Sequence, residues 1–179
     1  MNILISAVGG QGALLASRIF GNLADKIGQD IKLSEVHGMS QRGGSVVTHV
    51  RMGEKVYSPV VEKGTADFIM AFEQLEGARY IDWLKKDGNL IVNTQQIDPM
   101  PVVSGAAKYP GDLVSELSEL PIRLYSIDAV KLAKEAGNVK TANIILIGIL
   151  ASITDIPKQV WQDAIKETVP EKFLKENLK

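Results

Sequence analysis

The fold of this chain is decided by the stretch at its start, Asn2-Ile3-Leu4-Ile5-Ser6-Ala7-Val8-Gly9-Gly10-Gln11-Gly12. Residues 2–8 are a short apolar run, which predicts a strand buried on both faces. Glycines follow at once, and residues 13–27 then place an apolar side chain at every fourth position, at Leu15, Ile19, Leu23 and Ile27. This spacing predicts a helix with one apolar stripe, which Gly28 would end.

Further elements follow at regular intervals. A strand is expected over residues 30–36, and strand, glycine turn, helix and strand form a βαβ unit whose two strands run parallel with a right-handed connection. Residues 45–52 alternate between two faces, and a turn at 52–55 followed by a return over 56–58 predicts an antiparallel hairpin. Beyond it we expect strands over residues 66–72, 88–93 and 122–127, and helices over 73–86, 112–120, from Asp128 to 136, and from 141 onward.

These elements define the expected fold class. We predict an α/β protein with three layers (α/β/α), a mainly parallel sheet, an inserted antiparallel hairpin and a helical C-terminus. We find no internal repeat and no linker, so residues 1–179 are expected to form a single domain.

Composition excludes several classes of function. The chain has 20 Lys and Arg against 21 Asp and Glu, a net charge of −1 that gives no electrostatic reason to expect nucleic acid or a membrane as partner. It contains no cysteine, which excludes disulfides, iron–sulfur ligation and thiol nucleophiles within these residues. The longest apolar run, residues 144–151, is far shorter than the ~20 residues of a membrane helix. No secretory signal is recognised, so a cytoplasmic location is expected.

The glycine turn after the first strand is the first candidate site. Residues 7–12 match the dinucleotide pattern G-x-G-x-x-G, except that Ala7 takes the place of the first glycine. Gly9, Gly10 and Gly12 would let the backbone approach a ligand, and the following helix offers free N–H groups to an anion. Glu35 follows at about the distance of a ribose-binding acid, roughly 20 residues. The turn could bind an anionic ligand or a dinucleotide, or serve tight packing alone.

Gln11 is the unusual residue of this turn. Its side-chain amide has four hydrogen-bonding sites to satisfy in an apolar setting, which suggests a partner.

The segment from residue 34 to 45 is the second candidate. It is polar and rich in glycine, and it should project from the carboxyl edge of the sheet, where α/β proteins bind ligands. Arg42 could hold a carboxylate or phosphate, and His37 could exchange a proton near neutral pH. A solvent-facing loop is the alternative. The remaining candidates in this segment are Gly38, Met39, Ser40, Gln41, Gly43, Gly44 and Ser45.

Other polar residues are more ambiguous. Asn138, Lys140 and Asn143 could form part of a site or a capped helix start, and Asn93, at a strand end, has the same two interpretations. His49 lies within a strand and is expected to be structural. With only two histidines and no clear third ligand, we expect no metal site.

Several of these motifs occur together in one known family. Gly9-Gly10-Gln11-Gly12 and the run from His37 to Gly44 resemble the γ-type domain of 2-oxoacid:ferredoxin oxidoreductases, and within it the indolepyruvate-oxidising branch. The resemblance covers residues 2 to about 152, and Ala7 departs from the family's usual first glycine. Further matches are Tyr57-Ser58-Pro59, Ala66-Asp67, Phe72-Glu73-Gln74-Leu75-Glu76, Val92-Asn93-Thr94, and Gly137-Asn138-Val139-Lys140 leading to Asn143.

The resemblance implies an enzyme that decarboxylates a 2-oxoacid with thiamine diphosphate, passes two electrons through iron–sulfur clusters to ferredoxin, and forms an acyl-CoA. This chain has no cysteine and no Gly-Asp-Gly…Asn segment. Thiamine diphosphate, magnesium and the clusters are therefore expected on a larger partner subunit, with coenzyme A as co-substrate and no cofactor on this chain.

Within that complex the two glycine-containing segments are expected to form one surface that faces the partner's active site. His37 and Arg42 are the candidates for direct contact with reacting groups, and His37 and Gln11 would hydrogen-bond across the interface. The 2-oxoacid stays open among indolepyruvate, pyruvate, 2-oxoglutarate and branched acids. A free-standing dinucleotide-binding oxidoreductase and a purely structural subunit are the alternatives.

Overall fold

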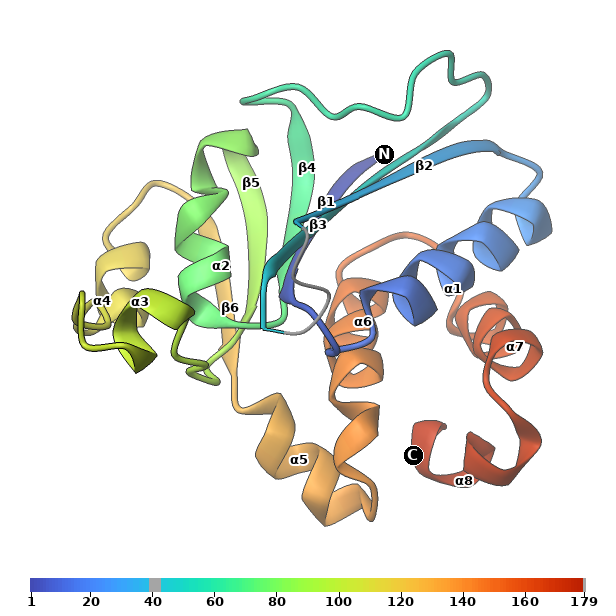
Figure 1. Cartoon of the computed structure of the whole chain (residues 1–179). Helices are drawn as coiled ribbons and strands as arrows, with labels where there is room; N and C mark the ends of the chain where they lie inside the picture. The colour runs from blue at the N-terminus through green and yellow to red at the C-terminus, as the bar shows by residue number, and fades with distance from the viewer. Residues whose placement is uncertain (39–42, 179) are drawn as a thin grey trace.

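The computed structural model describes residues 1–38 and 43–178, and in that part of the chain six strands form one sheet (Figure 1). Their spatial order is β2-β3-β1-β4-β5-β6. The strands β1, β4, β5 and β6 run parallel to one another, whereas β3 is antiparallel to both of its neighbours. The bounds are β1 (Asn2–Val8), β2 (Asp30–His37), β3 (Ser45–Gly53), β4 (Ala66–Ala71), β5 (Leu84–Asn93) and β6 (Arg123–Ile127).

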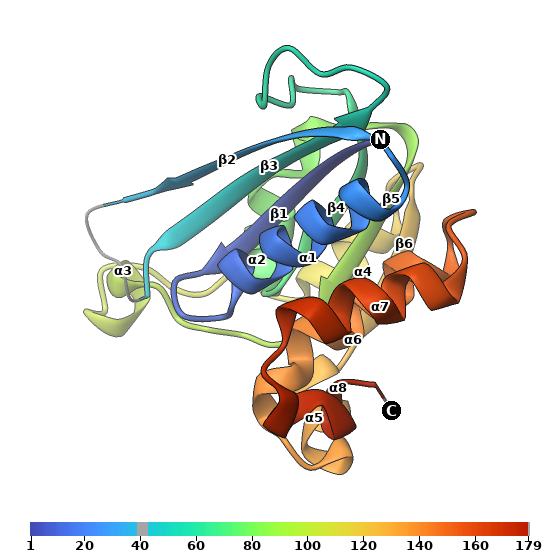
Figure 2. The ribbon, with the colours of Figure 1, turned by 90° about the vertical axis from the view of Figure 1, so that its right-hand side faces the viewer.

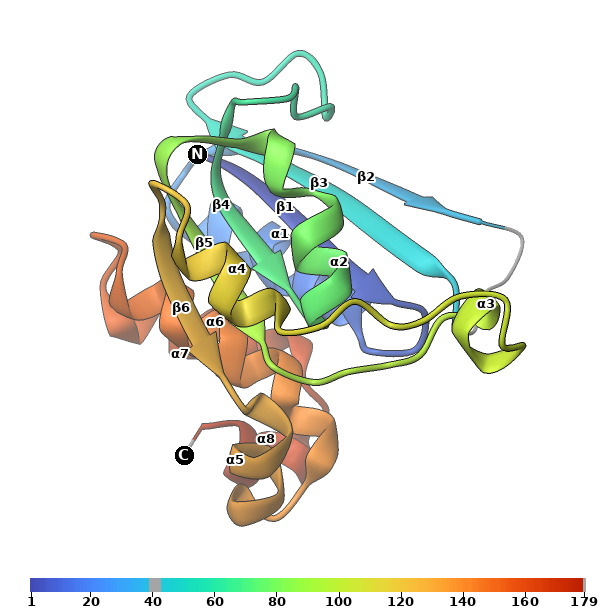
Figure 3. The ribbon, with the colours of Figure 1, turned by 90° about the vertical axis from the view of Figure 1, so that its left-hand side faces the viewer.

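Helices cover both faces of this sheet. The helices α1, α6 and α7 lie on one face, and α2 and α4 lie on the other, as Figures 2 and 3 show from opposite sides. The predicted three layers and helical C-terminus are confirmed. The bounds are α1 (Ala13–Lys26), α2 (Gln74–Arg79), α3 (Met100–Val103), α4 (Leu113–Ser118), α5 (Ala129–Ala136), α6 (Ala142–Ser152), α7 (Lys158–Thr168) and α8 (Leu174–Asn177).

The apolar core lies on both sides of β1. Ile3 and Ile5 face the cluster under α1, α6 and α7, whereas Leu4 faces the cluster under α2 and α4. All three side chains are fully buried, so the prediction of a strand buried on both faces is confirmed. In the first cluster Phe20 of α1 and Trp161 of α7 meet edge to face, with ring centroids 6.0 Å apart.

The place of the second strand differs from a simple βαβ unit. β2 runs in the same direction as β1, as predicted, but β3 lies between them and pairs with both. β3 carries buried apolar residues on both faces, including Val46, Val47 and Val50, whereas β2 is largely exposed. The more apolar strand therefore takes the inner position, and β2 becomes the edge of the sheet.

The predicted hairpin between residues 45–52 and 56–58 is wrong. Residues 56–58 form no strand, because β1 and β2 already occupy both edges of β3; the antiparallel hairpin is formed by β2 and β3. In the segment that follows β3, two backbone N–H groups donate to side chains instead of to a neighbouring strand. Val56 N donates to Asp30 Oδ2 at 2.9 Å, and Val61 N donates to His49 Nδ1 at 3.1 Å.

The helix predicted over residues 73–86 is also too long. α2 ends at Arg79, a 3-10 turn covers Ile81–Trp83, and β5 begins at Leu84, which pairs with Ala66 of β4. The apolar spacing that suggested a longer helix is used to bury the turn and Leu84 against the second cluster. The predicted helix cap at Asp128 is confirmed, since its Oδ1 accepts from Lys131 N at 2.9 Å at the start of α5.

Among residues 1–38 and 43–178, no helix has the length and apolar character that a membrane span requires.

Candidate functional site

The glycine turn between β1 and α1 has a backbone that only glycine adopts easily. Gly10 and Gly12 have φ angles of +101° and +91°. A Cβ atom at Gly12 would lie 2.6 Å from Nδ2 of Asn143, which is on α6 and far away in the sequence. The left-handed conformation therefore favours glycine at position 12, and a Cβ atom there would also displace the Asn143 side chain.

The turn separates two cavities at the carboxyl ends of the strands. One, of about 390 Å³, is bounded by residues 8–14 on one side and by Glu35, His37 and Val46 on the other. The second, of about 380 Å³, is lined by the same turn together with residues from β5, α5 and α6. Its polar lining comprises Gln11, Asn93, Gln95, Lys140 and Asn143.

The structure thus brings together residues from all three candidate segments. Glu35 and His37 lie two positions apart on β2, so their side chains share one face of the sheet. Gly9 N donates to Gly44 O at 2.8 Å, which joins the glycine turn to the start of β3. The expectation that these two segments form one surface agrees with this geometry. Met39, Ser40, Gln41 and Arg42 lie outside the described residues.

Gln11 finds its hydrogen-bond partners inside the chain. Its Oε1 accepts from Val8 N at 2.8 Å, and its Nε2 donates to Phe72 O at 2.9 Å and to Gln95 Oε1 at 3.2 Å. The amide was expected to have an outside partner, but these bonds within the chain occupy both donor sites and one of the two acceptor sites. Gln11 therefore fixes the turn against the ends of β4 and β5.

Asn93 has a similar structural part. It is 2% exposed, its Nδ2 donates to Phe72 O at 3.0 Å, and its Oδ1 accepts from Ala129 N at 3.1 Å. Asn93 joins the ends of β4 and β5 to the start of α5. These contacts favour the structural interpretation of Asn93 over a role in a binding site.

Asn138, Lys140 and Asn143 have separate roles. The Oδ1 of Asn138 accepts from Lys140 N at 3.0 Å and caps the 3-10 turn Val139–Thr141. Asn143 donates from Nδ2 to Gly12 O at 3.4 Å, so it contacts the glycine turn directly. Lys140 is exposed, lines the second cavity and has no ion pair among the described residues.

Ser45 and Gly38 are not among the residues that line the two cavities. The Ser45 hydroxyl donates to Glu76 Oε2 at 2.5 Å, and Glu76 also pairs with Arg79 at 3.1 Å. Burial raises the pKa of Glu76 above its ordinary value, although the Ser45 hydrogen bond and Arg79 oppose that shift. Ser45 therefore anchors the start of β3 to α2.

His49 is structural, as expected. It is half-buried in β3, its Nδ1 accepts from Val61 N, and burial lowers its pKa below the ordinary value of 6.5. A neutral ring is required for this bond, because a protonated Nδ1 cannot accept.

Two polar residues near the site were not singled out from the sequence. Gln95 holds both Gln11 and Asn93. Glu73 is 1% exposed, and its carboxyl oxygens accept from Glu76 N, Ile97 N and the Tyr109 hydroxyl. The available signal was their position directly after β4 and β5, the strand ends at which the other candidates also gather.

The arrangement can bind an anion. Among the described residues no side chain caps the first turn of α1, and the exposed Lys140 lines the second cavity together with Gly12 and Leu15. Within residues 1–38 and 43–178 no group of three or more His, Asp or Glu side chains could hold a metal ion.

The two cavities lie at the carboxyl edge of a mainly parallel sheet, which is where α/β proteins bind ligands. Residues 2–179 match the family model described as pyruvate ferredoxin/flavodoxin oxidoreductase, and the chain belongs to this family.

Curated relatives are similar over almost the full chain. The chain is 42% identical to "Indolepyruvate oxidoreductase subunit IorB" of Thermococcus kodakarensis over 183 residues, which cover 99% of this chain and 91% of that protein. It is 38% identical to the protein of the same name from Archaeoglobus fulgidus, over 100% of this chain and 90% of that one.

Solved structures share the fold. The gamma subunit of the keto/oxoacid ferredoxin oxidoreductase of Geobacter sulfurreducens superposes with a TM-score of 0.72 at 24% identity, covering 98% of this chain and 90% of that one. The 2-oxoglutarate:ferredoxin oxidoreductase of Magnetococcus marinus superposes with a TM-score of 0.68 at 18% identity, and this chain covers 29% of that longer chain.

Proposed function

We propose that this chain is the subunit of a 2-oxoacid:ferredoxin oxidoreductase that carries no redox cofactor, and that the glycine turn and its two cavities face the active site on a larger partner subunit. Family membership supports the enzyme class, and the names of the curated relatives support indolepyruvate as the 2-oxoacid. The observation that carries the site assignment is the glycine turn, which forms a wall of both cavities. We further propose a cytoplasmic location, which agrees with the absence of cysteine.

In the proposed reaction the bond between C1 and C2 of the 2-oxoacid breaks and CO₂ leaves. The remaining acyl group loses two electrons, which reduce ferredoxin, and forms a thioester with the thiol of coenzyme A, whose proton is released. Thiamine diphosphate would stabilise the negative charge that decarboxylation leaves on the acyl carbon.

The residues of this chain do not fit the cofactors of that reaction. The 179 residues contain no cysteine to ligate a cluster, and the described residues offer no acidic group of three for magnesium. The proposal therefore assigns thiamine diphosphate, magnesium and the iron–sulfur clusters to the partner subunit.

The contribution of this chain is to hold an anionic group and to shape the interface. Lys140 and the free N–H groups at the start of α1 would bind a phosphate of coenzyme A or the carboxylate of the 2-oxoacid. Arg42 would add a second cation. His37 would hydrogen-bond to the partner subunit. Gln11 would position the glycine turn through its hydrogen bonds to Phe72 and Gln95.

The proposal is tested by kinetics of the complex co-purified with its larger subunit. Replacing Lys140 by Gln, and separately Arg42 by Ala, should raise KM for coenzyme A or for the 2-oxoacid about tenfold or more, because a hydrogen bond to a charged group contributes about 1.5–3 kcal/mol. The matched control is Lys131→Gln, an exposed lysine of α5 that lines neither cavity. Dye reduction with a panel of 2-oxoacids names the substrate.

Unchanged kinetics in both variants, with normal assembly, would discard the anion role and leave a purely structural subunit. A free-standing dinucleotide enzyme is tested separately by an absorption spectrum and an NAD(P) titration of the chain alone. The structure gives one argument against it: β3 separates Glu35 from the glycine turn's own strand, whereas in the dinucleotide fold the acidic residue follows the adjacent strand.

A further inference from the structure

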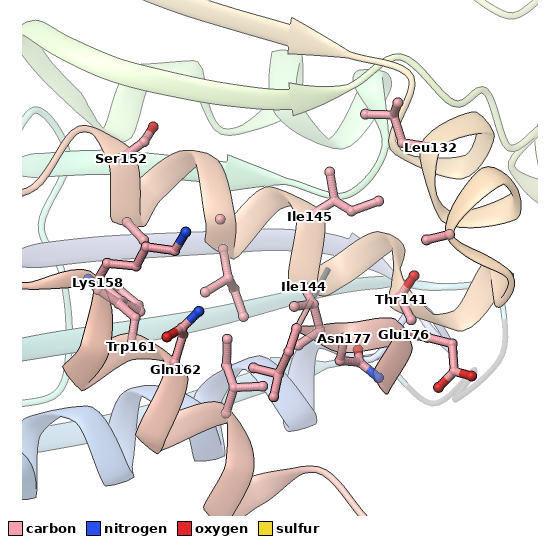
Figure 4. Close-up of a pocket in the computed structure, with 16 residues that line it drawn as sticks. Leu132, Thr141, Ile144, Ile145, Ser152, Lys158, Trp161, Gln162, Glu176 and Asn177 are labelled. Atoms are coloured by element: carbon pink, nitrogen blue, oxygen red, sulfur yellow. The ribbon is translucent and has the colours of Figure 1, made fainter. Parts of the chain in front are cut away.

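A third cavity, larger than the two at the glycine turn, lies apart from that turn. It has a volume of about 580 Å³, its walls come from α5, α6, α7 and the C-terminal α8 (Figure 4), and it opens to solvent beside the exposed Gly148 and Lys158. Helix α6 separates it from the site described above: Asn143 and Leu146 line the cavity at the turn, whereas Ile144 and Ile147 line this one.

Its walls are mainly apolar. Cavities of about 300–1,000 Å³ with mostly apolar walls and a few polar groups are typical of small-molecule sites. The apolar walls are formed by Ile144, Ile145, Ile147, Ala151, Ile165 and Leu178.

Gly148, in the middle of α6, lines this cavity without a packing reason inside the chain. A glycine within a helix costs about 0.5–1 kcal/mol relative to alanine. For Gly77 of α2 the reason is visible, since a Cβ atom there would lie 3.0 Å from Ala71 Cβ. A Cβ atom at Gly148 would meet nothing within 4 Å. Gly148 is exposed, so the space beside it opens to solvent and none of the described residues fills it.

The polar groups of the cavity lie mostly on α7. Lys158 and Gln162 are one helical turn apart and project into the cavity in Figure 4. Neither side chain has a hydrogen bond or ion pair with a described residue, whereas Lys166 of the same helix pairs with Asp163 at 3.1 Å. Trp161 of the same helix also has a buried indole N–H without an acceptor among the described residues.

The only carboxylate of the lining belongs to Glu176 on α8, at the end of the cavity opposite Lys158 (Figure 4). An ammonium and an amide at one end favour an anionic head group there, and a carboxylate at the other end disfavours one.

We propose that this cavity binds an apolar monocarboxylic acid, with its carboxylate on Lys158 Nζ and the Gln162 amide and its apolar body along Gly148. This inference does not depend on the proposed function. A helix of a partner subunit packed against Gly148 is the competing occupant. The small acid is favoured because four helices of this chain already form the walls of the space, and because the lining holds one cation and the unpaired indole N–H of Trp161.

The test is isothermal titration of the full chain with 3-phenylpropionate and with the uncharged 3-phenylpropanol. The acid should bind at least tenfold more tightly than the alcohol. Lys158→Gln should weaken binding of the acid about tenfold and leave the alcohol unchanged, because it removes one charge-assisted hydrogen bond. Lys166→Gln, on the same helix but outside the cavity, should change neither.

A second pair of variants tests the place of the apolar body. Gly148→Leu should fill the cavity and abolish binding of both probes, with folding verified by circular dichroism. Gly148→Ala should weaken binding and raise the melting temperature.

The proposal is overturned if 3-phenylpropionate gives no binding at millimolar concentration, or if Lys158→Gln or Gly148→Leu binds it like the unaltered chain. It is equally overturned if the unaltered chain binds neither probe and Gly148→Leu prevents co-purification of a larger subunit. That last result would identify the face as a subunit interface.

Discussion

Gly12 and Asn143 show how one contact fixes the geometry of the site. The two residues lie far apart in the sequence, yet Asn143 Nδ2 donates to Gly12 O and leaves no room for a Cβ atom at Gly12. Gly10, in the same turn, has a similar backbone conformation but open space around it. A comparison of substitutions at Gly10 and Gly12 can therefore distinguish the cost of backbone strain from the cost of the contact with Asn143.

We expect Gly12→Ala to destabilise the chain more than Gly10→Ala. Each alanine would cost about 1–2 kcal/mol in the left-handed conformation, and only the first would also displace Asn143. The measurement is urea unfolding of both variants, together with the double variant Gly12→Ala/Asn143→Ala. The double variant should lose less stability than the sum of the two single variants, because the Asn143 side chain that clashes with the new Cβ atom is no longer present. Equal losses at the two glycines would contradict the steric argument.

His49 gives the fold a dependence on pH. Because burial lowers the pKa of its folded state below 6.5, the unfolded chain binds the proton more readily, and stability falls as the pH drops below 6.5. We expect His49→Gln to reduce the loss of stability between pH 7.5 and 5.5, measured by urea unfolding. The exposed His37→Gln is the control, and an identical pH dependence in both variants would argue against this role.

At the scale of elements, burial on both faces decides the order of the strands. β3 replaces β2 beside β1 because it has apolar residues on both faces, and residues 54–65 are then held by side chains such as His49 and Asp30. A second long connection, between β5 and α4, is tied to α2 through the buried carboxyl of Glu73.

We expect Tyr109→Phe to loosen this second connection. The Tyr109 hydroxyl donates to Glu73 Oε1, and burial and this hydrogen bond raise its pKa above the ordinary value, so it remains a donor at neutral pH. Loss of the bond should cost about 1–3 kcal/mol and speed amide hydrogen exchange over residues 97–112. Unchanged exchange there, with Ser104→Ala as an exposed control, would show that the hydrogen bond between Tyr109 and Glu73 does not hold the segment.

At the scale of the whole molecule, one sheet links two apolar clusters. Trp161 belongs to the cluster under α1, α6 and α7, whereas Trp83 packs against the cluster under α2 and α4. The two tryptophans therefore report on opposite faces of the sheet.

If residues 1–179 form a single domain, both faces unfold together. We expect the single-tryptophan variants Trp83→Phe and Trp161→Phe each to show the same unfolding midpoint by fluorescence and by far-ultraviolet circular dichroism. Two separate midpoints in either variant would show that the faces unfold independently and that the single-domain prediction is wrong.

Periodic apolar patterns allowed most elements to be predicted, including β1, α1, β6 and the Asp128 cap of α5. The helix predicted over residues 73–86 shows why such a pattern can mislead. The spacing of Ile81 and Leu84 fits a helix, but Leu84 is buried by pairing with Ala66 in the sheet. A periodic pattern reports that a side chain is buried, and different backbones can bury the same side chain.

By itself the sequence determined the class of fold, the glycine turn and the family, because these depend on local spacing and on short motifs. Tertiary structure alone decided that β3 lies between β1 and β2, that Gln11 donates to Phe72 and Gln95, and that Lys140 lines a cavity together with the glycine turn. Each of these depends on contacts between residues far apart in the chain, and such contacts are set by which surfaces compete best for burial, which no local pattern encodes.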